Sequence, residues 1–140
     1  MIQDAQGNLV GTTQFGGQFG RGTIFQLTPA KKRWRQKVLY SFCAQDSCAD
    51  GAIPAAPVSI DSAGNIYGTT SAGGQYVPDG GTVFELHRRT FSTLHSFCQD
   101  QCTDGETPVG SVSIGASGEL FGMTVYGGAG GGGTVFKLEP

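Results

Sequence analysis

The stretch Gly-Asn-Leu-Val-Gly-Thr-Thr at residues 7–13 is followed along the chain by two close copies of itself. They read Gly-Asn-Ile-Tyr-Gly-Thr-Thr at residues 64–70 and Gly-Glu-Leu-Phe-Gly-Met-Thr at residues 118–124. Self-similarity at a period of about 55 residues is typical of repeat architectures. The period therefore indicates the fold class before any single element is assigned.

The remainder of each copy also recurs in a fixed order. A Gly-Gly pair comes next, at residues 16–17, 73–74 and 127–128, and then Gly-Thr-Ile/Val-Phe, at residues 22–25, 81–84 and 133–136. Two copies continue through Leu-x-Ser-Phe-Cys to an Asp-Gly pair, a proline and Val-Ser-Ile. We divide this single repeat domain into repeat 1 (about 1–57), repeat 2 (about 58–111) and a partial repeat 3 (about 112–140).

Each full repeat is predicted to contain four short antiparallel strands, so the fold class is all-β. In repeat 2 the strands fall near residues 58–61, 66–70, 82–86 and 93–97, which are rich in Val, Ile, Thr, Tyr and Phe. Asp61 and Gly64 predict a tight hairpin, because Asp bonds its own backbone and Gly accepts a positive φ. No window shows a capped helical period, so we expect almost no helix.

A four-stranded unit of this length is close in size to a β-propeller blade, which buries both faces only by stacking on other blades. The chain would contain about eleven strands, or roughly two and three-quarter blades. We therefore expect propeller-like repeats that are completed by self-association, for example as two chains forming six blades, or by the remaining repeats of a longer parent chain.

The composition favours a folded β protein and excludes several classes of partner. Glycine accounts for 24 of 140 residues, but 10% of residues are aromatic and only 14% are charged, so the glycines are expected to separate short strands. The net charge of -2 argues against nucleic acid as a partner, and no apolar run has the length needed for membrane insertion. The basic segment 31–37 is expected to be a solvated turn, with Trp34 folded onto the sheet.

Four cysteines form two pairs that are close in sequence, Cys43 with Cys48 and Cys98 with Cys102. Equivalent pairs in successive repeats predict one local disulfide in each, which suits an oxidising compartment. Free thiols and a four-thiolate zinc site are the alternatives. Nearby aspartates are expected to cap turns, with calcium binding as the less favoured interpretation. They are Asp46, Asp50, Asp100 and Asp104.

The order of these motifs resembles the choice-of-anchor tandem repeat family often called GloVer, over nearly the whole chain. Val10, Glu119 and Met123 depart from its pattern. The resemblance implies bacterial proteins of many repeats, secreted or attached to the cell surface, propeller-like and without an assigned activity. It brings no catalytic residues. The chain shows no export signal, so the localisation is implied by the resemblance and by the cysteine pairs.

Residues that the repeat does not dictate are the better candidates for ligand contact, and they lie in the glycine-rich loops at 13–22, 70–81 and 124–133. Those singled out are Phe19, Arg21, Tyr76, Asp79 and Tyr126. No catalytic or cofactor-binding constellation is visible, and His95 is expected to be an ordinary strand residue. We expect a non-enzymatic scaffold for interaction or adhesion, with a glycan or protein ligand. The alternatives are a fragment of a carbohydrate-active propeller enzyme and a purely structural self-assembling module.

Overall fold

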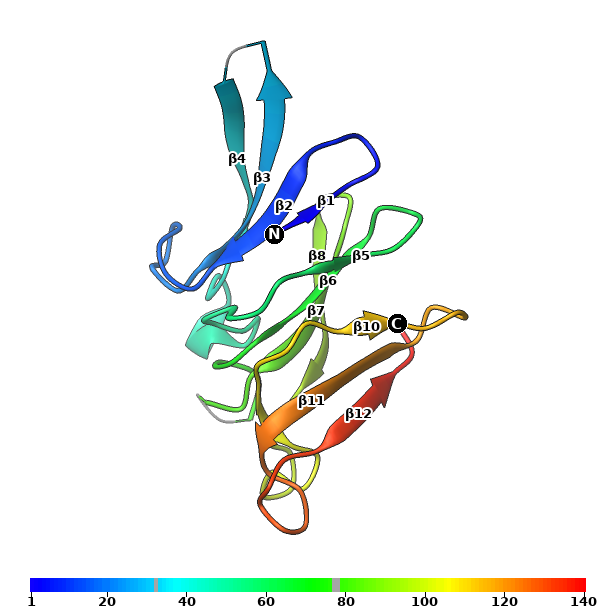
Figure 1. The fold of residues 1–140 in the computed structure, drawn as a ribbon. Coiled ribbons are helices and arrows are strands. Elements are labelled where there is room, and N and C mark those ends of the chain that lie inside the picture. Colours follow the sequence, from blue (N-terminus) through cyan, green and yellow to red (C-terminus); the bar gives the residue numbers. More distant parts are fainter. Residues whose placement is uncertain (32, 77–78) are drawn as a thin grey trace.

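The computed structural model describes residues 1–31, 33–76 and 79–140, which form an all-β fold. Three antiparallel sheets follow one another along the chain (Figure 1). Apart from one short 3-10 turn, η1 (Asp46–Cys48), the described residues form strands, turns and loops, and they include no helix that could span a membrane. Lys32 of the basic segment, and Val77 and Pro78 of the second glycine-rich loop, lie outside the described residues.

The first two sheets are meanders that are each built from one repeat, and the third combines the strands of repeat 3 with one strand of repeat 2. The first contains β1 (Ile2–Gln3), β2 (Leu9–Thr13), β3 (Thr23–Ala30) and β4 (Arg33–Ser41). The second contains β5 (Ser59–Ile60), β6 (Ile66–Thr70), β7 (Thr82–His87) and β8 (Thr90–Ser96). The third contains β10 (Ser113–Ile114), β11 (Leu120–Tyr126) and β12 (Val135–Leu138), with β9 (Glu106–Pro108) paired to the far end of β11. The strands expected in repeat 2 are confirmed, whereas β9 was not expected.

The central position of the recurring heptapeptide must be glycine for a steric reason. On β6, Gly68 lies opposite Phe84 of β7, and a Cβ atom at Gly68 would stand 2.6 Å from Cζ of that ring. Gly11 and Gly122 lie opposite phenylalanines in the same register in the other two sheets. The ring therefore packs directly over a strand that has no side chain at this point, as in other aromatic–glycine pairs across β-strands.

Two apolar cores fill the spaces between neighbouring sheets. The core between the first and second sheets consists of Val10, Ile24, Phe42, Val58, Ile66, Phe84 and Leu86. The core between the second and third sheets consists of Tyr67, Val83, Phe97, Val112 and Leu120. All five members of the second core occupy the repeat positions of members of the first, so the same interface is built twice along the chain.

The turn between the first two strands of a repeat is closed by an aspartate. Asp61 accepts hydrogen bonds from the backbone N–H groups of Ala63 (2.9 Å) and Asn65 (2.8 Å) and from the Asn65 side chain (2.8 Å). Partial burial opposes ionisation of Asp61, but these bonds outweigh it and lower the pKa of the carboxyl group. Asp4 forms the same turn in the first sheet, so the predicted hairpin is confirmed.

Strands β3 and β4 continue beyond the first sheet as a projecting two-stranded ribbon (Figure 1). Trp34, on β4, is 51% exposed on this ribbon. The expectation that Trp34 folds onto the sheet is therefore wrong, because Trp34 pairs with Pro29 on the ribbon rather than with the strands of the sheet core.

Candidate functional site

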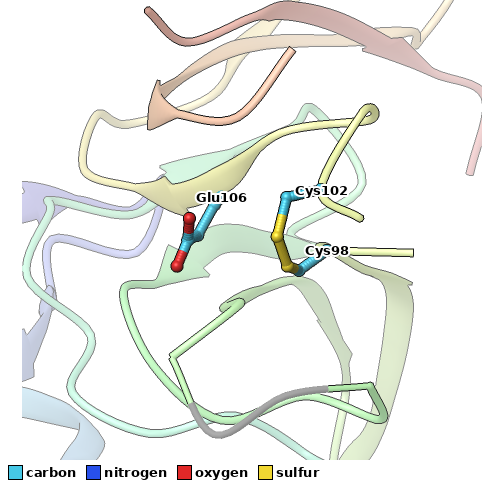
Figure 2. Close-up of side chains that lie close together, drawn as sticks. All are labelled: Cys98, Cys102 and Glu106. Carbon is cyan, nitrogen blue, oxygen red and sulfur yellow. A yellow bond between two sulfur atoms is a disulfide. The ribbon is translucent and has the colours of Figure 1, made fainter. Parts of the chain in front are cut away.

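Both predicted cysteine pairs lie at disulfide-bonding distance, Cys43 with Cys48 and Cys98 with Cys102. A zinc site would need these sulfurs as thiolates, and the disulfides remove them. Among the described residues, the one group with ligand atoms close enough to hold a metal is Cys98, Cys102 and Glu106, and it contains a disulfide (Figure 2). The cysteines therefore close loops at the end of the fourth strand.

A buried aspartate anchors the first of these loops. Asp50 is fully buried and accepts hydrogen bonds from the Tyr40 hydroxyl (2.7 Å) and from the N–H groups of Ala44 (2.9 Å) and Gln45 (3.1 Å). Burial and the bond to Asp50 raise the pKa of Tyr40, so the hydroxyl stays protonated as a donor. Because both carboxylate oxygens already accept protein donors, the turn-capping role predicted for Asp50 accounts for its contacts.

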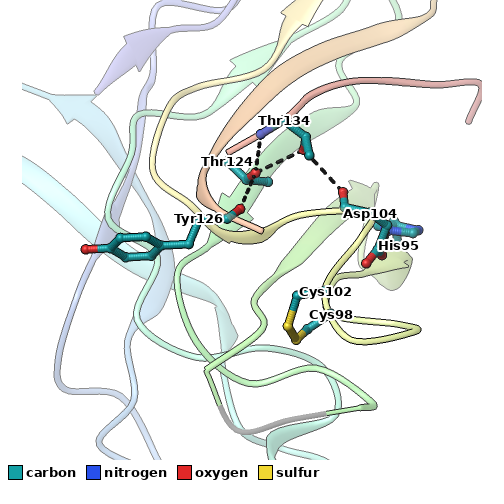
Figure 3. Close-up of polar contacts among 7 residues, drawn as sticks. All are labelled: His95, Cys98, Cys102, Asp104, Thr124, Tyr126 and Thr134. Carbon is teal, nitrogen blue, oxygen red and sulfur yellow. Dashed lines mark hydrogen bonds and ion pairs between the residues drawn. A yellow bond between two sulfur atoms is a disulfide. The ribbon is translucent and has the colours of Figure 1, made fainter. Parts of the chain in front are cut away.

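The equivalent position in repeat 2 is less completely bonded. His95, in the place of Tyr40, lies with Nε2 3.0 Å from Oδ2 of Asp104, and both side chains are about one-quarter exposed (Figure 3). Oδ1 of Asp104 is buried and has no hydrogen-bond partner among the described residues. The sequence interpretation of His95 as an ordinary strand residue missed this pair, which only the return of the loop onto β8 brings together.

Each disulfide loop also contacts the repeat that follows it. The Cys48 carbonyl accepts the N–H groups of Gly51 (2.8 Å) and Gly74 (3.0 Å), and the Cys102 carbonyl accepts that of Gly128 (2.9 Å). The threonines of the recurring motifs bond to each other: the Thr124 and Thr134 hydroxyl groups are hydrogen-bonded at 3.0 Å (Figure 3). Thr134 also donates from Oγ1 to the Asp104 carbonyl (3.2 Å), so the recurring Gly and Thr residues hold a disulfide loop against the following repeat.

A hollow on the outer side of each full repeat separates the fourth strand from the glycine-rich loop. In repeat 2 it has a volume of about 740 Å³ and lies between residues 91–96, around β8, and Gln75 and Tyr76 of the loop. Gln45 and Ala49 of the preceding disulfide loop form a third wall. We call this the β8 hollow. Thr93 is one of the lining residues, but its Oγ1 is buried and has no hydrogen-bond partner among the described residues.

The corresponding hollow in repeat 1 is smaller, at about 360 Å³. It lies between Phe19 and residues 38–41, with Ala44 at its edge. Phe19 stands at the repeat position of Tyr76, so each full repeat places one loop aromatic beside its fourth strand. The β8 hollow is larger because the disulfide loop of repeat 1 adds a third wall.

The residues proposed from the sequence as ligand contacts do not form one site. Tyr76 and Phe19 line the two hollows. Tyr126 is 56% exposed and points away from the sheet (Figure 3). Arg21 and Asp79 are exposed, and their backbone carbonyls accept hydrogen bonds from Ile53 N–H and the Thr107 hydroxyl of the same repeats. The polar residues of the β8 hollow were missed, because three separate segments have to meet before it exists.

Comparison with known proteins agrees with the repeat motifs. No curated protein and no solved structure matches the chain significantly. A family model described as the Gloeobacter/Verrucomicrobia repeat matches residues 1–140. The chain therefore belongs to the Gloeobacter/Verrucomicrobia (GloVer) repeat family.

Proposed function

We propose that this chain is a non-enzymatic scaffold of propeller-like blades, secreted or held at the cell surface, which binds a glycan in the β8 hollow. The observation that carries the proposal is the hollow itself. Tyr76 is 45% exposed beside it, and the amide-bearing Gln45 and the exposed, hydroxyl-bearing Ser92 line it. An aromatic face with amide and hydroxyl groups around it suits the apolar face and hydroxyl groups of a sugar ring.

The blade arrangement is supported by the recurrence of one interface. The first sheet packs on the second as the second packs on the third, through residues at equivalent repeat positions. A rotation that recurs between similar sheets leads to a ring when enough blades are present. The disulfides support an oxidising, extracellular environment.

The proposal of a non-enzymatic role is supported by the surroundings of the His95–Asp104 pair. A histidine oriented by an aspartate is two-thirds of a nucleophilic triad, which also needs a hydroxyl or thiol bonded to the imidazole. In the described parts of the chain, the one side chain that hydrogen-bonds to the His95 ring is Asp104, and the nearby cysteines are paired as a disulfide. The pair is better explained as the variant in repeat 2 of the Tyr40–Asp50 contact.

The test is a glycan array on the purified chain, with Tyr76→Ala and Tyr126→Ala as a matched pair of variants. Both tyrosines are exposed, but only Tyr76 lines the hollow. We expect selective binding that Tyr76→Ala weakens about tenfold and Tyr126→Ala leaves unchanged. Binding that is indifferent to Tyr76 would contradict the proposed site, and release of a shortened glycan would support the carbohydrate-active alternative.

A self-assembling role is the second candidate, favoured by the uncovered face of the third sheet. Val135 is 78% exposed, whereas Val83 at the same repeat position is fully buried. Phe121, Met123 and Val125 are exposed beside it. Such a patch marks an interaction surface, and another sheet of the same kind, as in a homo-oligomer, fits it.

Sedimentation of the chain over a range of concentrations tests this second role. We expect association that Val135→Lys abolishes. Trp34→Lys, which replaces an exposed side chain on the projecting ribbon, should leave the association unchanged. A monomer at every concentration would count against assembly through this face.

A further inference from the structure

Beside the apolar cores, neighbouring repeats are joined by antiparallel backbone pairing, through a single bridge at the first junction and a short strand pair at the second. At the first junction, Ala52 and Ala72 exchange two backbone hydrogen bonds (2.7 and 3.1 Å) and Ser71 N–H donates to the Ile53 carbonyl (3.1 Å). At the second, Glu106 lies opposite Tyr126, and Pro108 opposite Thr124. In both, the disulfide loop continues as an Asp-Gly-x-x-Pro segment that lies along the next repeat.

The first glycine of each Gly-Gly pair is required by this contact. Gly73 has a φ of +76°, and a Cβ atom there would stand 2.6 Å from the Cys48 carbonyl oxygen. At Gly127 the corresponding distance, to the Cys102 carbonyl oxygen, is 2.5 Å. A side chain at either position would collide with the disulfide loop of the preceding repeat.

Residues 14–17 of repeat 1 have a similar backbone, but none of the described residues covers Gly16. Gly16 has a φ of +85°, and a Cβ atom there would meet nothing within 4 Å. Residues 14–17 are exposed, and Phe15, at the position of Ala72, is 66% exposed. Within the described parts of the chain, the N–H groups of Phe15 and Gly17 have no backbone partner, although Ala72 and Gly74 do.

We propose that residues 14–17 are a peptide-binding edge whose ligand is a disulfide-closed Cys-x3/4-Cys loop that continues as Asp-Gly-x-x-Pro. The ligand adds as an antiparallel strand: its second cysteine carbonyl accepts the Gly17 N–H, and the residue after its glycine pairs with Phe15. Two copies of this contact inside the chain show what fits the edge. The inference rests on the proposed role as a scaffold of stacking repeats, and it names the chemistry by which a further repeat is held.

The probe is the disulfide-closed peptide with the sequence of residues 43–57, titrated into the full-length ¹⁵N-labelled protein. The edges of repeats 2 and 3 are already occupied by tethered segments of high effective concentration, so the peptide reaches only the edge in repeat 1. We expect the amide resonances of Phe15 and Gly17 to shift as they gain acceptors. Those of Gly74 and Gly128 should stay in place, as should all of them with a scrambled peptide.

Two glycine variants separate docking from folding. Gly16→Ala places a Cβ atom where the ligand carbonyl must lie, and we expect it to weaken peptide binding about tenfold or more. Gly20→Ala is the matched control, because Gly20 also has a positive φ (+74°) and open space around it. It should bind as the wild type does.

The inference is overturned if the peptide leaves the amides of residues 14–17 unchanged, or if Gly16→Ala binds as well as Gly20→Ala. It is also overturned if a scrambled peptide shifts the same amides. The glycan array involves the β8 hollow and this titration involves residues 14–17, so failure of either is read independently of the other.

Discussion

Replacing Gly68 by alanine tests why the recurring heptapeptide contains a glycine at its centre. The new Cβ atom would stand 2.6 Å from Cζ of Phe84 and 3.0 Å from Cε1. Carbon atoms pack at about 3.5–4.0 Å, so the ring has to retreat by roughly 1 Å. Phe84 is fully buried, with the Phe42 and Phe91 rings at centroid distances of 5.2 and 5.7 Å, so the ring has little room to move.

Overpacking of this kind costs about 1–3 kcal/mol. Alanine loses less backbone entropy than glycine when it folds into a strand, which offsets about 0.5–1 kcal/mol of this cost. Because the buried ring has little room to move, the overpacking cost lies near the upper end of this range, and we expect Gly68→Ala to lower the free energy of unfolding by about 2 kcal/mol, or the melting temperature by roughly 6 °C. Urea and thermal denaturation followed by circular dichroism measure both quantities.

Two further variants make the test specific. Gly122→Ala also collides with a phenylalanine, Phe136, but this ring is only partly buried and can swing toward solvent, so its loss should be smaller, below about 1 kcal/mol. Gly130→Ala has nothing within 4 Å and should change stability by less than about 0.5 kcal/mol. A Gly68→Ala protein as stable as the wild type, or a larger loss in Gly122→Ala, would refute the reasoning.

The remaining predictions concern the loops and turns. Thiol titration of the denatured protein should find reactive thiols only after reduction, and reduction should lower stability by about 2 kcal/mol per disulfide. Asp50→Asn should destabilise by about 2–3 kcal/mol in urea, and Asp104→Asn by less, because Asp50 accepts three hydrogen bonds and Asp104 one. Because the pKa of Asp61 is lowered in the folded state, the ionised carboxylate stabilises the fold by about 1 kcal/mol above about pH 4, and this contribution is lost as the pH falls below that. The free energy of unfolding of Asp61→Ala should therefore be lower than that of the wild type at pH 7 and approach it in acid.

Most of the fold could be predicted from local sequence patterns. The strands of repeat 2 follow from β-branched and aromatic residues between glycine turns, and the disulfides follow from cysteines only a few residues apart. Strand β9 could not be predicted, because it contains a proline and its partner lies in the next repeat. Its counterpart in repeat 1 is only a single bridge, Ala52 to Ala72.

The candidate site was harder to predict than the fold. Tyr76 stood out as an aromatic in a variable loop, but Gln45 and Thr93 carry no such signal. They line the hollow only because a disulfide loop of one repeat is held against the fourth strand of the next. Proximity of this kind depends on how repeats pack, which the pattern within a single repeat does not encode.

The segment that joins one repeat to the next also determines how the protein unfolds. Residues 48–54 are bonded to their own repeat, through Cys43 N–H to the Gly51 carbonyl (3.1 Å), and to the next repeat, through Gly74. Neither repeat can unfold without breaking hydrogen bonds that also stabilise the adjacent repeat. The smallest cooperative unit is therefore larger than the sequence repeat, and the stability of the chain resides as much in its junctions as in its sheets.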